Sequence, residues 1–90
     1  MSHPFLEIKK GENSYIRYFS DSRHDDEYCW HRDKEERKVK VISCGKNWKF
    51  QFDNNFPFIL KEGMCIDIKK EEWHKLHKGE NRLILEIVKG

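Results

Sequence analysis

Turn-forming residues recur along this chain at short intervals, with only brief apolar runs between them. The turn signals are Gly11-Glu12-Asn13, Asp21-Ser22, Cys44-Gly45-Lys46, Asp53-Asn54-Asn55, Glu62-Gly63 and Gly79-Glu80-Asn81. The runs span residues 5–8, 15–19, 27–32, 38–43, 48–52, 58–60, 64–68, 73–76 and 83–88. Short runs bounded by frequent turns are typical of an all-β sandwich or barrel. With 90 residues, the chain is expected to form one such domain over residues 1–90.

Several of these runs show the two-residue period of a strand. Val39 and Val41 alternate with lysines, and Trp48 and Phe50 alternate with Lys and Gln. Because successive side chains of a strand point to opposite faces, one face of each strand is expected in the core. The run at 83–88 is apolar at nearly every position, so this strand is expected to be covered on both faces.

Two segments also have helical features. Residues 33–40 are rich in helix-favouring Lys, Glu and Arg, and a helix from Asp25 onwards would include them, but no apolar stripe continues through it that a helix could bury. Residues 69–78 end before Gly79, a plausible helix cap, and Trp73 and Leu76 have helical spacing. A strand and a short helical turn both fit this second segment.

The charge pattern disfavours a dedicated nucleic-acid binder. Charged residues make up 38% of the chain, and a 13% aromatic content argues against disorder. Eighteen basic and sixteen acidic residues are interleaved and leave a net charge of +2. Nucleic-acid binders usually gather basic residues on one face, so no nucleic-acid partner is expected.

The three cysteines, Cys29, Cys44 and Cys65, are odd in number and far apart. No disulfide framework follows from them, and there is no C-x-x-C pair for a zinc finger. The chain begins without a signal-peptide pattern, and no apolar run approaches membrane length. We therefore expect a cytoplasmic protein without a membrane partner.

His31, Asp33 and His74 are the candidate metal ligands. If residues 28–33 form a strand, His31 and Asp33 face one pocket, while Trp30 and Arg32 face the other side. Two imidazoles and one carboxylate suit a divalent metal ion, with iron, manganese and zinc as the candidates. Trp30 on an outer surface predicts a contact area, and we expect a homodimer.

The stretch from Gly63 to His74 resembles the second motif of the cupin superfamily. That motif reads Gly, five residues, Pro-x-Gly, two residues and a metal-binding His, and the spacing here matches without a gap. Lys69 and Glu71 stand where the Pro and the second Gly usually are. The resemblance implies a cupin-type double-stranded β-helix, a jelly-roll barrel, with His74 as a ligand at its mouth.

The first cupin motif has its counterpart between His31 and Gly45. It reads His-x-His, three or four residues, Glu, six residues and Gly, and here Asp33 replaces the second His and Lys38 the Glu. A charged lysine cannot ligate a metal. Because Val39 faces the core, Arg37 rather than Lys38 is expected to point inwards, unless a bulge changes the register.

The three remaining ligands also resemble the His-x-Asp…His triad of non-haem iron(II) oxygenases, which share the barrel architecture. This resemblance implies open metal positions for O₂ and a small polar molecule, and either iron-dependent oxidation or isomerisation. Arg37 or Arg82 could bind a substrate carboxylate, and Gln51 could line the pocket. The sequence alone does not decide whether the protein is an enzyme.

Two further interpretations stay open. The resemblance covers residues 27–88, about two thirds of the chain, and the whole pattern is similar to small cupin-like proteins of tailed phages. The protein could therefore be a non-catalytic binding or structural cupin with a degenerate metal site. Alternatively, the basic and aromatic residues at 46–52 could stack on single-stranded nucleic acid.

Overall fold

The computed structural model describes residues 5–22 and 28–90, and these residues form eight β-strands without a helix. The strands are β1 (Phe5–Lys9), β2 (Ser14–Phe19), β3 (Arg37–Ser43), β4 (Lys49–Phe52), β5 (Phe58–Ile59), β6 (Cys65–Ile68), β7 (His74–His77) and β8 (Leu83–Lys89). The described residues contain no helix long and apolar enough to cross a membrane. The expected all-β architecture is confirmed.

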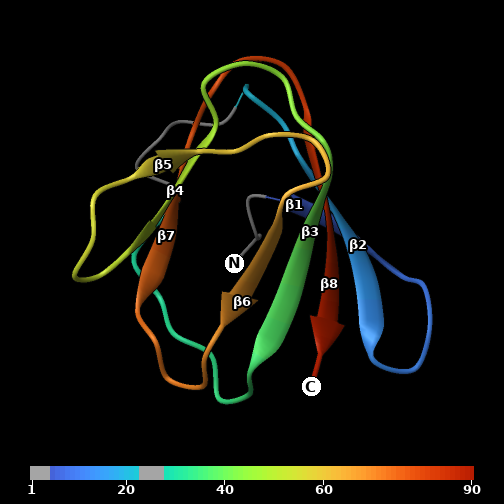
Figure 1. Ribbon diagram of the computed structural model, residues 1–90. Coiled ribbons are helices and arrows are strands. Elements are labelled where there is room, and N and C mark those ends of the chain that lie inside the picture. Colours follow the sequence, from blue (N-terminus) through green and yellow to red (C-terminus); the bar gives the residue numbers. More distant parts are fainter. Residues whose placement is uncertain (1–4, 23–27) are drawn as a thin grey trace.

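The strands form two antiparallel sheets that face each other (Figure 1). The larger sheet has the strand order β1-β2-β8-β3-β6, and the smaller has the order β5-β4-β7. The consecutive strands β1 and β2 pair directly, as do β4 and β5, whereas β3 and β4 lie in different sheets, so the chain also crosses between the layers. The segment at 28–36 runs beside β7 and leads into β3, and thereby links the two sheets at one end (Figure 1).

The two-residue period places the core between the sheets. Val39, Val41, Leu85 and Ile87 alternate with more exposed residues on β3 and β8, and all four are buried. Trp48 is 1% exposed, and its indole N–H donates to the carbonyls of Glu80 and Asn81 at 3.2 and 3.1 Å. A buried indole therefore has its polar atom satisfied, as burial of such a group requires.

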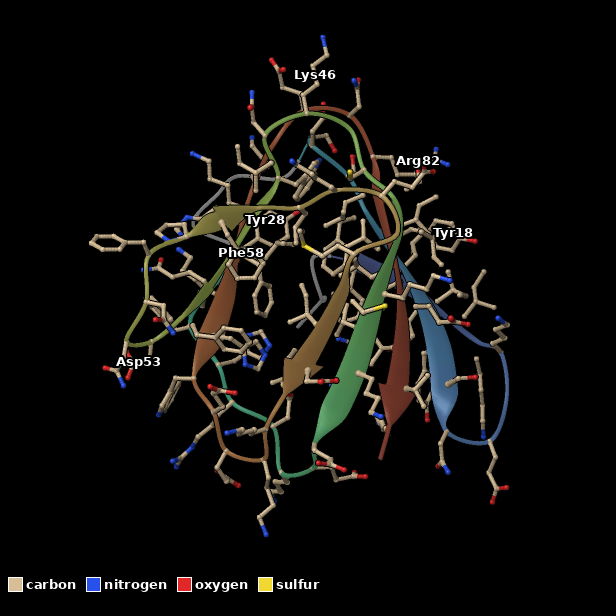
Figure 2. The ribbon with its side chains drawn as sticks, in the orientation of Figure 1. Tyr18, Tyr28, Lys46, Asp53, Phe58 and Arg82 are labelled. Atoms are coloured by element: carbon tan, nitrogen blue, oxygen red, sulfur yellow. The ribbon has the colours of Figure 1, made fainter. Side chains whose placement is uncertain are left out.

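The indole is enclosed by two loops that meet at one end of the barrel. Lys46 pairs with Glu80 there, and Lys46 lies at the tip of the loop between β3 and β4 (Figure 2). A Cβ added at Gly45 would lie 1.8 Å from the carbonyl oxygen of Glu80, and one at Gly79 would lie 2.2 Å from that of Lys46. Only glycine allows so close an approach of the two backbones.

One expectation from the sequence is corrected, and two open alternatives are excluded. Residues 28–33 do not form a strand: only His31 pairs, as an isolated bridge to His74. The helical alternative at 69–78 is wrong, because its second half is strand β7 of the smaller sheet. Trp48 and Phe50 are buried, so they are not available as a stacking platform for nucleic acid.

Candidate metal centre

The centre of the site is the pairing between His31 and His74. Their backbones exchange two hydrogen bonds, of 3.0 Å from His31 N to His74 O and 2.9 Å in return. Directly opposed residues of an antiparallel pair project their side chains to the same face. The centroids of the two imidazole rings accordingly lie 4.2 Å apart. The His31 side chain is exposed, whereas His74 is only 2% exposed.

Asp33 completes a three-residue cluster. Its Oδ2 lies 3.4 Å from His74 Nε2, and one ligand atom from each of His31, Asp33 and His74 lies within 4.8 Å of the others. The backbone of Asp33 is fixed by a 2.7 Å hydrogen bond that its carbonyl accepts from the Glu71 amide. The structure thus brings together the three residues that the sequence nominated.

Backbone carbonyls set the orientation of both imidazoles. His74 Nδ1 lies 2.7 Å from the Glu72 carbonyl oxygen, and His31 Nδ1 lies 3.1 Å from that of Cys29. A carbonyl oxygen only accepts, so each Nδ1 carries the proton and donates it. In the neutral rings the lone pair is therefore on Nε2. Metal-binding histidines are commonly held in this way, with the second ring nitrogen bound to a carbonyl.

The protonation state of His74 follows from its surroundings. Burial lowers the pKa of the His74 imidazole below its ordinary value, and the neighbouring His31 lowers it further. The Glu72 carbonyl and Asp33 act in the opposite direction without reversing the shift. A lowered pKa favours the neutral ring with a free lone pair on Nε2.

The cluster therefore brings together hydrogen-bond acceptors that have no donors to pair with. Asp33 Oδ2 is buried and has no hydrogen-bond partner among the described residues. A carboxylate oxygen and an imine nitrogen 3.4 Å apart repel each other unless a cation lies between them. That spacing is also close to the one expected for two ligands about 2.1 Å from a tetrahedral ion. The donor set and its geometry fit a divalent metal.

Arg37 is the fourth residue at this site. It lies on the inward face of β3, is 16% exposed, and places Nη2 3.4 Å from Asp33 Oδ1. The expectation that Arg37 and not Lys38 points inwards is confirmed, since Lys38 is exposed. A bulge between Val41 and Ser43 inserts one extra residue further along β3. The first cupin motif allows either three or four residues before its Glu. With three residues after Asp33, the Glu position is occupied by Arg37, and the extra residue of the bulge accounts for the longer distance from there to Gly45.

Glu71 has a backbone conformation that favours glycine. Its φ is +63°, in the left-handed region, and it stands where the second cupin motif has its second Gly. The conformation matters for the site because it directs the Glu71 amide to the Asp33 carbonyl. The side chain forms an exposed ion pair with Arg32 at 3.2 Å. The turn thus has a glycine-type backbone conformation at a residue that is not glycine.

We predict that Glu71→Gly is more stable than Glu71→Ala by about 1 kcal/mol, because Ala is strained at positive φ. Both variants lose the ion pair with Arg32, so their difference reports the backbone alone. Urea unfolding measures it. Lys70 is the matched control, since it is not among the positive-φ residues, and there Ala should be at least as stable as Gly. Equal stability of the two variants at position 71 would contradict the prediction.

Gln51 and His77 do not belong to the cluster. Phe52 pairs with His74 and Phe50 with Leu76, so the intervening Gln51 projects to the other face of the smaller sheet. Gln51 Oε1 lies there 2.8 Å from His77 Nε2, and Gln51 Nε2 donates to the Asn55 carbonyl. The expectation that Gln51 lines the pocket is therefore corrected.

A residue that the sequence did not nominate supports the site from within. Phe50 stacks on the His74 ring with a centroid distance of 5.5 Å and an interplanar angle of 23°. It closes the inner side of the cluster, while the exposed His31 marks the outer side. The alternation at 48–52 predicted that Phe50 is buried. Its contact with His74 depends on the register between β4 and β7, which no local pattern reveals.

Comparison with known proteins identifies the fold. No protein-family model and no curated protein matches the chain. Among solved structures, the DMSP lyase DddQ from Ruegeria pomeroyi matches 97% of this chain and 47% of its own, with a TM-score of 0.75 and 13% identity. An iron(II) form of HppE matches 86% of this chain and 41% of its own, with a TM-score of 0.67 and 12% identity.

A cupin-2 domain protein from Shewanella frigidimarina matches 93% of this chain and 76% of its own, with a TM-score of 0.61 and 13% identity. The expected cupin-type fold is thereby confirmed. The chain spans less than half the length of DddQ and of HppE. Identities this low show a shared fold and leave the activity open.

Proposed function

We propose that this protein binds one divalent metal ion through Nε2 of His31, Nε2 of His74 and the carboxylate of Asp33. One observation carries the proposal: three electron-pair donors converge at a half-buried point, and Asp33 Oδ2 there has no hydrogen-bond partner among the described residues. Buried polar atoms are almost always paired, so an orphaned carboxylate oxygen in such a cluster calls for a cation.

Each residue has a defined part in holding the ion. His31 and His74 supply neutral ligands, kept in the correct tautomer by the carbonyls of Cys29 and Glu72. Asp33 supplies a negative charge and a hard oxygen ligand. Phe50 excludes water from the inner side and restricts the His74 ring by stacking.

We further propose that the bound ion serves the chemistry of a small polar molecule, either iron-dependent oxidation or metal-assisted isomerisation. A divalent metal supplies a Lewis acid, and iron also supplies a site for O₂. One structural neighbour supports the iron-dependent assignment, because it is an iron(II) protein. The exposed edge of His31 leaves the outer side of the cluster accessible to such a molecule.

The test is to load the purified protein with iron(II), manganese(II) and zinc(II) in turn. We expect one ion per chain by elemental analysis. Because a ligand of the folded state stabilises it, free metal at a hundred times the Kd should add about 2.7 kcal/mol. For a domain of this size the Tm should rise by roughly 10–20 °C, and a chelator should reverse the rise.

The matched control is the double variant His31→Ala/His74→Ala, which should show neither the bound ion nor the metal-dependent rise in Tm. Background metal content and an unchanged Tm for the native sequence would contradict metal binding. That result would favour a non-catalytic cupin, in which the Arg37–Asp33 ion pair takes the place of the metal.

A further inference from the structure

The guanidinium of Arg37 has an N–H donor without a hydrogen-bond partner among the described residues. It offers five N–H donors, yet its ion pair with Asp33 spans 3.4 Å, longer than an ordinary hydrogen bond. Its Nε is buried and has no hydrogen-bond partner among the described residues. A planar, always charged group with unmet donors is suited to an oxyanion, which it can hold through two parallel hydrogen bonds.

The charges around the cluster point to the same ligand. Asp33 and Arg37 carry opposite charges and offset each other, and an imidazole that ligates a metal through its lone pair adds no charge. A divalent ion in this setting would leave two uncompensated positive charges in a half-buried site. Uncompensated charge away from water is costly, and an anion bound beside the metal would remove much of that cost.

The position of Arg37 allows one anion to reach both partners. Asp33 contacts Arg37 through Oδ1 and faces His74 through Oδ2, so the guanidinium and the proposed metal site lie on the two sides of one carboxylate. Phe50 closes the inner side, and His31 leaves the outer side accessible. An anion that reaches both partners needs to span only the width of one carboxylate, so a small oxyanion such as a carboxylate is sufficient.

We propose that this site binds a divalent metal and a small oxyanion together, with one oxygen of the anion directed to the metal and another to Arg37. The inference rests on the proposed metal site and adds to it the class of its second ligand. It gives Arg37 the role of anion receptor and makes metal affinity depend on the anion. Linkage requires the reverse as well, so the metal should raise the affinity for the anion by the same factor.

Arg37 opposes the metal when no anion is present. Its positive charge repels the ion, and its ion pair competes for the Asp33 carboxylate. Removing the charge should therefore raise metal affinity in the absence of anion and abolish the effect of added anion. These two changes in opposite directions distinguish an anion receptor from a residue that only supports the fold.

The experiment titrates the full chain with manganese(II) and follows the electron paramagnetic resonance signal of the free ion. Sodium acetate is the probe anion, sodium perchlorate keeps the ionic strength constant, and neutral acetamide is the shape control. In the native sequence we expect acetate to raise the manganese affinity roughly tenfold and acetamide to leave it unchanged. Comparing acetate with acetamide tests the requirement for charge without any mutation.

Arg37→Gln should bind manganese more tightly than the native sequence without acetate, and should show no response to acetate. Arg82→Gln is the matched control, because Arg82 lies toward the end of the barrel marked by Lys46, away from the start of β3 (Figures 1 and 2). It should retain the full acetate effect.

Three other outcomes would each contradict part or all of the proposal. Manganese binding that is equal with and without acetate would overturn this inference and leave the metal site standing. An acetate effect that persists in Arg37→Gln would show that acetate acts on the metal alone, and would overturn the role of Arg37. No manganese binding to the native sequence under any condition would overturn both this inference and the proposed function.

Discussion

His74→Ala should lower the affinity for divalent metal by more than about a hundredfold. Mutation of a residue that only orients a metal ligand typically lowers metal affinity by roughly 10- to 100-fold, and loss of a ligand itself should lower it more. His74 is also the most buried of the three ligands and the only one within a strand, so no neighbouring group can replace it. Titration with manganese or zinc, monitored by calorimetry, measures the change.

His77→Ala is the matched control for that experiment. It removes the same side chain from the same strand, but His77 bonds Gln51 on the opposite face of the sheet. Asp33→Asn provides a second test that preserves volume, and it should also weaken binding strongly because the charged ligand is lost. Circular dichroism establishes that each variant is folded. Native affinity in folded His74→Ala would exclude His74 as a ligand.

Trp48→Ala should reduce the free energy of unfolding by about 3–5 kcal/mol, the usual cost of removing a fully buried aromatic side chain. Trp48 packs against Phe19 and, edge to face, against Tyr28, with centroid distances of 6.4 and 6.0 Å. Its N–H also holds the loop carbonyls of Glu80 and Asn81. A domain of 90 residues is expected to have a total stability of roughly 5–14 kcal/mol, so much of it would be lost.

The control for this prediction is Trp73→Ala. Trp73 is 41% exposed, and Arg32 covers its ring with a centroid distance of 5.1 Å. A partly exposed ring of this kind should contribute no more than about 1 kcal/mol. Urea unfolding of the two variants should therefore give clearly different midpoints. Similar midpoints would mean that Trp48 is not the main packing element of the core.

The strand pattern was predictable because a strand buries alternate residues. The valines of β3 and the aromatic residues of β4 show that period, and both lie in the core as expected. Residues 28–33 were predicted as a strand and form a single bridge instead. This stretch has no two-residue alternation, since Tyr28, Cys29 and Trp30 are followed by three polar residues. Only Tyr28 is buried, and the stretch connects the two sheets without pairing along its length.

The ligands were predictable from spacing, and their environment was not. Motif spacing nominated His31, Asp33 and His74, which the fold brings together. Arg37 shares the inward face of β3 with Val39 and Val41, as their alternation predicted, whereas the bulge further along the strand is not fixed by a local pattern. The stacking of Phe50 on His74 and the positive φ of Glu71 likewise depend on tertiary pairing.

The most direct test of this account is a crystal grown with manganese or zinc and measured at the absorption edge of the metal. We predict one anomalous peak per chain, about 2.0–2.2 Å from Nε2 of His31, Nε2 of His74 and a carboxylate oxygen of Asp33. An anomalous peak bound by other residues, or no peak in metal-saturated crystals, would contradict the assignment of this cluster as a metal centre.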